Sequence, residues 1–395
     1  MDPVRNPYAP GAGQRPPELA GRDAELAAFD LLLERISRGR PERSVILIGL
    51  RGVGKTVLLN AMRSAAVRRG WGTGKLEARP DRTIRRPLAS ALHMAVRELA
   101  GRNQDEAAHV LGVVKAFAQR DTAAKSGRQP WQVGIAAPAV TGRADSGDIE
   151  IDLVELFADV AGLAGDSGHG IAVFFDEMQD LGAGDVSALC AACHEIAQLA
   201  LPLVVVGAGL PHLPAVLSAS KSYSERLFRY ARIDRLDRPA HDRALRAPAR
   251  DEDADFTDDA LAAMYDRTGG YPYFVQAYGK VAWDVAPRSP IAATDVAVAA
   301  PEAEAELAVG FFGSRYERAT PAEREYLRAM ADLAEHTDGG PVPTAAVAEA
   351  LSRPPQSLSP ARDGLLKKGL VYSGQRGQIA FTVPHFGHYL RQQEM

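Results

Sequence analysis

The stretch Val45–Thr56 reads VILIGLRGVGKT and decides the fold of this chain. Four apolar residues predict a buried parallel strand, and a glycine-rich turn follows them. The residues after the turn continue as a predicted helix, so strand, turn and helix come in the order of a phosphate-binding loop (P-loop). The spacing G-x-x-x-x-G-K-[ST] is met by four residues, Gly49, Gly54, Lys55 and Thr56.

Each position of this loop has a chemical role. Glycines let the backbone turn tightly and bring its N–H groups close to phosphate oxygens. The following helix directs the positive end of its dipole at the same anion. We expect Lys55 to reach the β- and γ-phosphates of ATP, and the Thr56 hydroxyl to bind Mg²⁺.

A second informative stretch, Gly170–Glu177, reads GIAVFFDE and predicts a buried strand that ends in two acids. Open α/β sheets bind ligands at the carboxyl ends of their strands. We expect Asp176 to hold Mg²⁺ and Glu177 to orient and activate the attacking water. The residues predicted to bind the nucleotide are Gly49, Leu50, Arg51, Gly52, Val53, Gly54, Lys55, Thr56, Val57 and Asp176.

Length and composition set the class of protein. A chain of 395 residues is long enough for two or three domains, and 46% hydrophobic with 24% charged residues is ordinary for a soluble protein. A net charge of −4 excludes a nucleic-acid polycation, although a local basic surface stays open. No apolar run is long enough to span a membrane, and residues 1–17 lack the apolar core of a secretory signal. With only two cysteines, we expect a cytoplasmic protein.

The two cysteines have the spacing of a haem attachment motif, C-x-x-C-H, at Cys190–His194. The surrounding residues 186–197 have helical periodicity, and haem attachment of this kind requires export. We therefore predict an ordinary packed helix here.

Arginines follow the next apolar strand, which spans Leu201–Pro211. Arg226 and Arg229 are candidates for an arginine finger or a γ-phosphate sensor, and Arg226 is our catalytic candidate. The alternative is a helix that carries exposed arginines.

The last third of the chain is predicted to be helical, with a module of three helices and a hairpin at its end. Helices are expected from Thr320, over 342–351 and over 357–368, and the hairpin over 369–383. This pattern predicts a winged helix-turn-helix whose third helix enters a DNA major groove. The alternative is a winged helix that docks a protein, because acidic and basic residues nearly balance. The DNA-contact candidates are Arg362, Lys367, Lys368 and Arg376.

The predicted fold class is α/β: a parallel-sheet P-loop ATPase core with a helical lid, followed by a C-terminal winged helix-turn-helix domain. The predicted boundaries are a flexible tail over 1–17, the core over 18–237, the lid over 238–310 and the winged helix over 311–395.

From Arg22 to about Val383 the chain resembles the AAA-type ATPases of the Orc1/Cdc6-like and STAND-like group. Both nucleotide motifs match those of the group. Gly21–Leu26 is similar to its N-terminal nucleotide-facing motif, and Gly270–Pro272 to its lid motif. The resemblance implies ATP with Mg²⁺, a helical lid and nucleotide-controlled assembly or DNA loading.

Two departures from the group predict slow turnover. The sensor position at the end of the strand in 201–211 is occupied by Gly207–Gly209, which has no polar side chain, and no clear lid arginine stands beside Tyr271–Pro272. We expect either an ATPase whose nucleotide state controls DNA engagement, or a signalling switch whose winged helix docks a protein. Expected partners are ATP, duplex DNA or a protein, and further copies of the chain; no membrane is expected.

Overall fold

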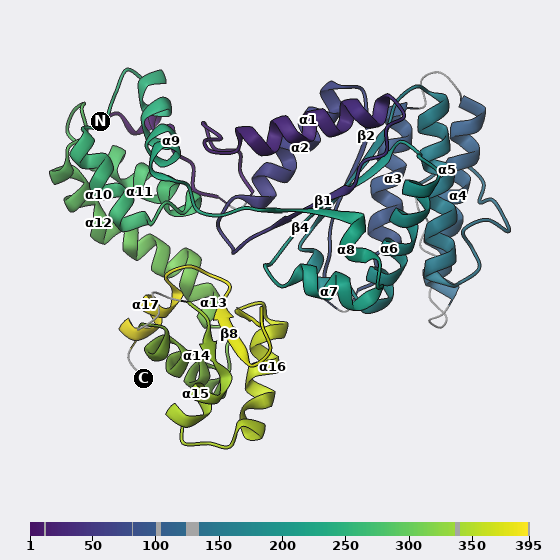
Figure 1. Cartoon of the computed structure of the whole chain (residues 1–395). Helices are drawn as coiled ribbons and strands as arrows, with labels where there is room; N and C mark the ends of the chain where they lie inside the picture. Colours follow the sequence, from purple (N-terminus) through teal and green to yellow (C-terminus); the bar gives the residue numbers. More distant parts are fainter. Residues whose placement is uncertain (12, 81, 100–103, 124–133, 336–339, 394–395) are drawn as a thin grey trace. The chain divides into compact units, whose positions relative to one another are not determined.

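Apolar runs of the sequence form a five-stranded parallel sheet in the computed structural model (Figure 1). The strand order is β2-β3-β4-β1-β5, and β3 and β4 are buried along their whole length. Such burial on both faces explains why these strands are continuous apolar runs, and it confirms the predicted parallel core. The strands are β1 (Ser44–Ile48), β2 (Gly72–Glu77), β3 (Ile171–Asp176), β4 (Leu203–Gly209) and β5 (Phe228–Arg232). The structure describes residues 1–11, 13–80, 82–99, 104–123, 134–335 and 340–393.

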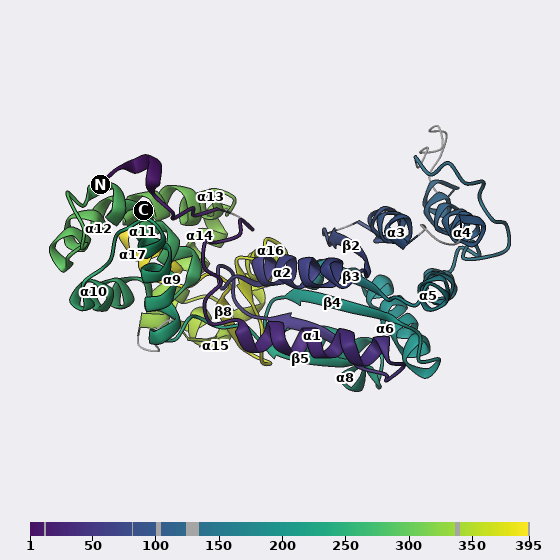
Figure 2. The ribbon, with the colours of Figure 1, turned by 90° about the horizontal axis from the view of Figure 1, so that it is seen from above.

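Helices cover both faces of this sheet. Figures 1 and 2 show α1 and α2 on one face, where Phe29 of α1 meets Phe174 of β3 edge to face at 6.3 Å. Helices α6, α7 and α8 lie on the other face (Figure 1). Helix α3 packs on β2, and α4 and α5 continue the layer toward α6. The helices are α1 (Asp23–Ser37), α2 (Lys55–Arg68), α3 (Arg85–Leu99), α4 (Gln104–Ala123), α5 (Ile149–Asp166), α6 (Ala183–Gln198), α7 (Leu213–Ser220) and α8 (Ser224–Leu227).

The chain divides into two compact units. The sheet unit holds Ala24–Ile48 and Leu58–Arg232. The helical unit holds Met1–Asp23, Gly49–Val57 and Ile233–Met395, so the P-loop packs with the helical unit although its flanking strand and most of its helix belong to the sheet.

Four helices form the lid region of the helical unit. The Thr257 side chain caps α10 by accepting from Ala260 N–H at 3.3 Å, and Pro272 is the first residue of α11. Both helix starts were predicted, and both are confirmed. The helices are α9 (Arg238–Asp251), α10 (Asp258–Thr268), α11 (Pro272–Val285) and α12 (Ala293–Leu307).

The prediction of a flexible tail is wrong for the first residues of the chain. They include a 3-10 helix, η1 (Pro3–Arg5), and Tyr8, which is buried. The Tyr8 ring packs against Trp283, and its hydroxyl donates to the Leu245 carbonyl at 2.5 Å. One aromatic side chain thus gives a Pro- and Gly-rich segment enough apolar area to fix it on the lid.

The C-terminal region has the element order that the predicted winged helix-turn-helix requires. A helix, a strand, two helices and a hairpin follow one another, and the three strands pair antiparallel in the order β6-β8-β7. The first helix begins with the predicted capping box of Thr320 and Glu323. The elements are η3 (Ala308–Gly313), α13 (Ser314–Tyr316), α14 (Pro321–Ala334), β6 (Val342–Pro343), α15 (Thr344–Ala350), η5 (Pro355–Leu358), α16 (Ser359–Lys367), β7 (Val371–Tyr372), β8 (Gln378–Phe381) and α17 (Phe386–Gln392).

The lid and the C-terminal region share one hydrophobic core. Phe312 of η3 lies 5.9 Å from Phe274 of α11, 6.1 Å from Phe386 and 5.2 Å from Tyr389 of α17, measured between ring centroids. The boundary predicted between residues 310 and 311 therefore runs through this aromatic cluster.

Candidate functional site

The P-loop joins β1 to α2 through glycines that its conformation needs. Gly52 and Gly54 have φ angles of 84° and 90°, in the region that other residues rarely adopt. The Ile233 carbonyl oxygen lies only 2.1 Å from the place of a Cβ on Gly49, so that glycine permits a close approach of two backbones. A Cβ on Gly54 would meet nothing within 4 Å. The loop thus has an open inner side, which fits a phosphate group.

The cation of this loop lies across it. Lys55 Nζ donates to the carbonyl oxygens of Gly49 and Leu50, at 2.9 and 2.7 Å. Lys55 is also the first residue of α2, a helix of 14 residues whose N-terminal N–H groups face the loop. Ammonium, backbone amides and helix dipole are all suited to the polyphosphate of a nucleotide.

Two side chains or backbone groups from distant segments fix the shape of the loop. Buried Arg22 donates through Nη2 to the carbonyls of Val53, at 3.1 Å, and Asp234, at 2.6 Å. Tyr273 N–H of the lid donates to the Gly52 carbonyl at 3.3 Å. The motif did not reveal this role of Arg22; the only signal was its place in Gly21–Leu26, the stretch similar to a nucleotide-facing motif.

A third contact joins the loop to the C-terminal hairpin. Arg51 N–H donates to the Thr382 carbonyl at 2.9 Å. Thr382 is fully buried, and its hydroxyl donates to the carbonyls of Gly369, at 2.7 Å, and Leu370, at 3.1 Å. A Cβ on Gly369 would lie 2.9 Å from Nη2 of Arg51, so the glycine leaves room for the guanidinium. The backbone of the phosphate-binding loop is therefore bonded directly to the region predicted as a winged helix.

Asp176 is the last residue of β3 and is buried. Its Oδ1 accepts from Glu177 N–H at 3.1 Å, and Lys75 Nζ of β2 lies 3.7 Å from its Oδ2. Lys75 also donates to Asn60 Oδ1 at 2.7 Å. Sequence reasoning missed Lys75 and Asn60, because only the pairing of β2 with β3 brings them to the carboxylate. Carboxylate oxygens suit Mg²⁺, and Asp176 fits the predicted role of holding it.

The sheet brings the ends of β1 and β3 to one edge. Gly207 pairs with both Ile46 and Phe175, so β4 separates the two strands and their carboxyl ends lie about 10 Å apart. The P-loop follows β1 directly, and Glu177 follows β3. The loop with Thr56 belongs to the helical unit and Asp176 to the sheet unit, and a joint Mg²⁺ site of these two residues stays a prediction.

The end of β4 has no side chain for a packing reason. A Cβ on Gly207 would lie 2.0 Å from Met178 Sδ and 2.8 Å from Ile46 Cδ1. Glycine is therefore required where the sheet is crowded, and a polar sensor side chain cannot stand at this position.

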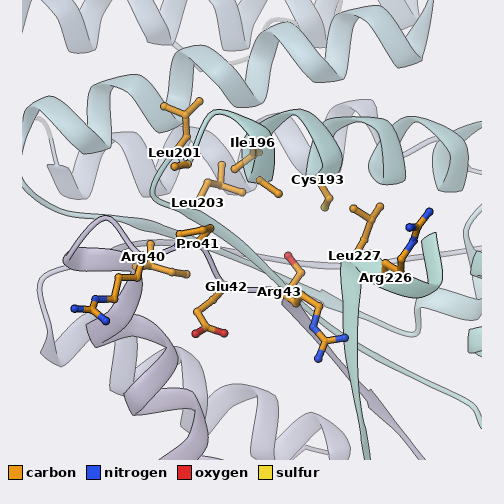
Figure 3. A pocket seen from close by; sticks show the side chains of 14 residues that line it. Arg40, Pro41, Glu42, Arg43, Cys193, Ile196, Leu201, Leu203, Arg226 and Leu227 are labelled. Carbon is orange, nitrogen blue, oxygen red and sulfur yellow. The ribbon is translucent and has the colours of Figure 1, made fainter. Parts of the chain in front are cut away.

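Arg226 lies at the opposite edge of the sheet from Asp176. It belongs to α8, two residues before β5 begins, whereas Asp176 ends a parallel strand. Figure 3 shows it beside Leu227 and Cys193 at a pocket of about 70 Å³, far smaller than the ~300 Å³ of a typical ligand site. A strand of five residues spans ~17 Å, beyond the reach of an arginine. A γ-phosphate sensor in the same subunit is therefore excluded for Arg226, and a role in a neighbouring subunit stays a prediction.

Three of the four DNA-contact candidates are available at the surface of the C-terminal region. Lys367 ends α16 and is exposed, and Arg376 is exposed in the turn of the hairpin. Arg362 is half-buried, and its guanidinium bonds to the neighbouring Asp363 at 3.1 Å. The placement of these three residues is compatible with the predicted contacts.

The prediction for Lys368 needs correction. Lys368 Nζ lies 2.5 Å from Oε2 of buried Glu323, the residue that closes the capping box of α14. Although burial opposes ionisation, the hydrogen bonds from Lys368 and from Thr320 N–H lower the pKa of Glu323. Lys368 therefore neutralises a buried carboxylate and is not an outward-facing DNA contact.

The two cysteines lie on α6, as predicted, and both are buried. Burial raises the pKa of Cys190 to about 11 and raises that of Cys193 further. Protonated, buried thiols are poor nucleophiles and poor metal ligands. Among the residues that the structure describes, no group of three His, Cys, Asp or Glu could hold a metal ion, and no helix is long and apolar enough to cross a membrane.

Comparisons with known proteins agree with this site. A family model described as "AAA ATPase domain" matches residues 18–206, and a domain of unknown function (DUF8462) matches residues 309–390. A comparison with curated proteins gives no match.

Solved structures with similar folds include three ATPase-related proteins. A Walker-type ATPase of Pyrococcus abyssi has a TM-score of 0.60 at 17% identity, over 95% of this chain and 97% of the other. The Orc1 protein of Aeropyrum pernix, solved in complex with DNA, has a TM-score of 0.45 at 16% identity, over 95% and 94%. The Holliday junction branch migration motor RuvB of Thermotoga maritima has 0.45 at 18%, over 97% and 100%. The first of these shows that the fold of the whole chain is that of a Walker-type ATPase.

Proposed function

This chain is a P-loop ATPase of the AAA type, and we propose that its nucleotide state controls engagement of duplex DNA by the C-terminal region. It binds ATP with Mg²⁺ and hydrolyses the nucleotide slowly. The hydrogen bond from Arg51 N–H to the Thr382 carbonyl carries this proposal, because it joins the phosphate-binding loop to the hairpin of the C-terminal region.

The proposed chemistry uses residues of the loop and of the β3 end. P-loop amides and Lys55 hold the β- and γ-phosphates, while Thr56 and Asp176 hold Mg²⁺. The bound Mg²⁺ supplies positive charge that neutralises the phosphate oxygens. Glu177 accepts a proton from the attacking water. Turnover is slow because the β4 end offers no side chain to the γ-phosphate, and Gly207 has no room for one.

Phosphate and the Thr382 carbonyl compete for one donor. A backbone N–H has a single hydrogen, so Arg51 cannot donate fully to both acceptors. A phosphate oxygen is the stronger acceptor because it is charged, and the bond given up is worth only ~1 kcal/mol net. Release of Thr382 frees Gly369 and Leu370, to which its hydroxyl donates, and these follow α16 directly. ATP binding thus loosens the predicted DNA-reading helix from the P-loop.

A second candidate is a signalling switch whose winged helix docks a protein partner. It is favoured by the internal pairing of Lys368 with Glu323 and of Arg362 with Asp363, which leaves a less basic surface than the sequence predicted. The two candidates differ in whether duplex DNA binds with a strong dependence on salt.

Assembly with further copies of the chain is part of this proposal. At its edge of the sheet, Arg226 could complete only the site of a neighbouring subunit, as an arginine finger does. Sedimentation of the protein with Mg·ATP should show an oligomer, and a strict monomer at all concentrations would remove this role.

The test measures ATP turnover and ATP affinity with and without duplex DNA. Glu177→Gln should lower turnover by about 100-fold or more while affinity stays within about twofold, because only the general base is lost. Lys55→Ala is the control that should lose ATP binding. Unchanged turnover in Glu177→Gln would remove the assigned role of Glu177. Turnover that ignores DNA would favour the protein-docking candidate.

A further inference from the structure

Gln179 connects the second acid to the end of β4. It lies in η2 (Met178–Asp180), directly after Glu177. Its Nε2 donates to Glu177 Oε2 at 2.5 Å, and its Oε1 accepts from Leu210 N–H at 3.2 Å. A Cβ on Gly209 would lie 3.0 Å from that same Oε1, so the small residue at the strand end makes room for the amide.

The backbone of Glu177 makes this contact significant. Glu177 has φ 51° and ψ 43°, a left-handed conformation that costs a non-glycine residue about 1 kcal/mol. Its own N–H is bonded to Asp176 Oδ1 at 3.1 Å. The direction of the Glu177 carboxylate is therefore not set by a regular strand or helix, and it depends on the side chain that bonds to it.

We propose that Gln179 is a positioning residue for the hydrolysis that Glu177 promotes. Its amide group holds the carboxylate and ties it to the backbone at the end of β4, where a polar side chain cannot stand. The inference rests on the proposed ATPase function and adds a residue to it. Gln179 acts through Glu177 and does not itself touch the reacting atoms.

Two variants separate the donor from the acceptor of this amide. Gln179→Leu removes both, whereas Gln179→Glu keeps the shape and the acceptor for Leu210 N–H but removes the donor at neutral pH. At pH 8 both should lower kcat by about 10-fold or more, because a misplaced catalytic group loses rate steeply. The Kd for Mg·ATP should stay within about twofold of the wild-type value in both.

The pH dependence distinguishes positioning from a structural role. In Gln179→Glu, two carboxylates in contact share a proton with a raised apparent pKa. The protonated form again offers a donor to Glu177. The kcat defect of Gln179→Glu should therefore shrink as the pH falls from 8 to 6, while that of Gln179→Leu should not.

The matched control is Gln198→Glu, which makes the same change at an exposed residue at the end of α6. It should leave kcat and its pH profile unchanged. Wild-type kcat in Gln179→Glu at pH 8, or a loss of ATP affinity equal to the loss of kcat, overturns the inference. If Gln179→Leu does not fold, Gln179→Glu alone decides. Failure of the proposed function looks different: wild-type protein would then hydrolyse ATP no faster than Glu177→Gln.

Discussion

Asp152 is a carboxylate buried inside the helical layer of the sheet unit, and it shows what one charged residue contributes there. It accepts from the Ser146 N–H and hydroxyl, at 2.8 and 2.6 Å, and from Arg85 Nη2 at 2.7 Å. Arg85 is buried as well. Burial alone would raise the pKa of Asp152, but the hydrogen bonds from Ser146 and Arg85 outweigh it and lower the pKa.

We predict that Asp152→Asn destabilises the sheet unit by about 3 kcal/mol at pH 7, because it leaves the Arg85 charge buried without its partner. Since the folded-state pKa is lowered, the carboxylate stabilises the fold above its unfolded pKa of ~3.9, and this contribution is lost as the pH falls through the folded value. Urea unfolding followed by circular dichroism should show a large difference at pH 7 and a small one near pH 3. Asp105→Asn, at an exposed position on α4, is the control; an equal effect of both variants would contradict the prediction.

At the scale of elements, the hairpin of β7 and β8 and the P-loop act as one joint. The hairpin bonds to Arg51, Arg22 bonds to Val53, and Tyr273 of the lid bonds to Gly52. A loop held at three successive residues by three distant segments can report its occupancy to each of them.

We predict that Mg·ATP raises backbone hydrogen exchange in the segment 369–383, because phosphate takes the Arg51 N–H and releases Thr382. Exchange followed by mass spectrometry on Glu177→Gln, which should hold ATP unhydrolysed, measures this. ADP should have a smaller effect, and Lys55→Ala with ATP none. Slower exchange in the segment on ATP binding would show that the nucleotide tightens this joint, contrary to the proposed release.

At the scale of the whole molecule, DNA engagement depends on a few exposed charges in a chain whose net charge is −4. Reversing Arg362, Lys367 and Arg376 to Glu should weaken duplex binding by 10-fold or more at ~0.1 M salt. It should also reduce the slope of log K against log salt by about 3, since each lost phosphate contact contributes ~0.9. Fluorescence anisotropy over a salt series measures both.

The matched control reverses Arg38, Arg40 and Arg43, which are exposed at the opposite edge of the sheet from Asp176. It should leave the salt slope unchanged. If the first triple variant binds as the wild-type protein does, α16 and the hairpin turn do not read DNA, and the protein-docking candidate gains.

Local patterns in the sequence determined much of this protein. Four apolar residues, a glycine turn and Lys55–Thr56 predicted β1, the P-loop and α2, and the apolar run ending at Asp176 predicted β3. The helix starts at Thr257 and Thr320 followed from capping chemistry. These features are set by neighbours in the chain, because side-chain period, φ preference and capping act over a few residues.

Only the tertiary structure decided which distant groups meet. Lys75 reaches Asp176 because β2 pairs with β3, and Lys368 is taken by Glu323 although 45 positions separate them. Tyr8 fixes a segment that composition alone marks as flexible. Arg226 is set at the far edge of the sheet because all five strands run parallel. A side chain's partner depends on strand order and packing, and these are properties of the whole chain that no local pattern contains.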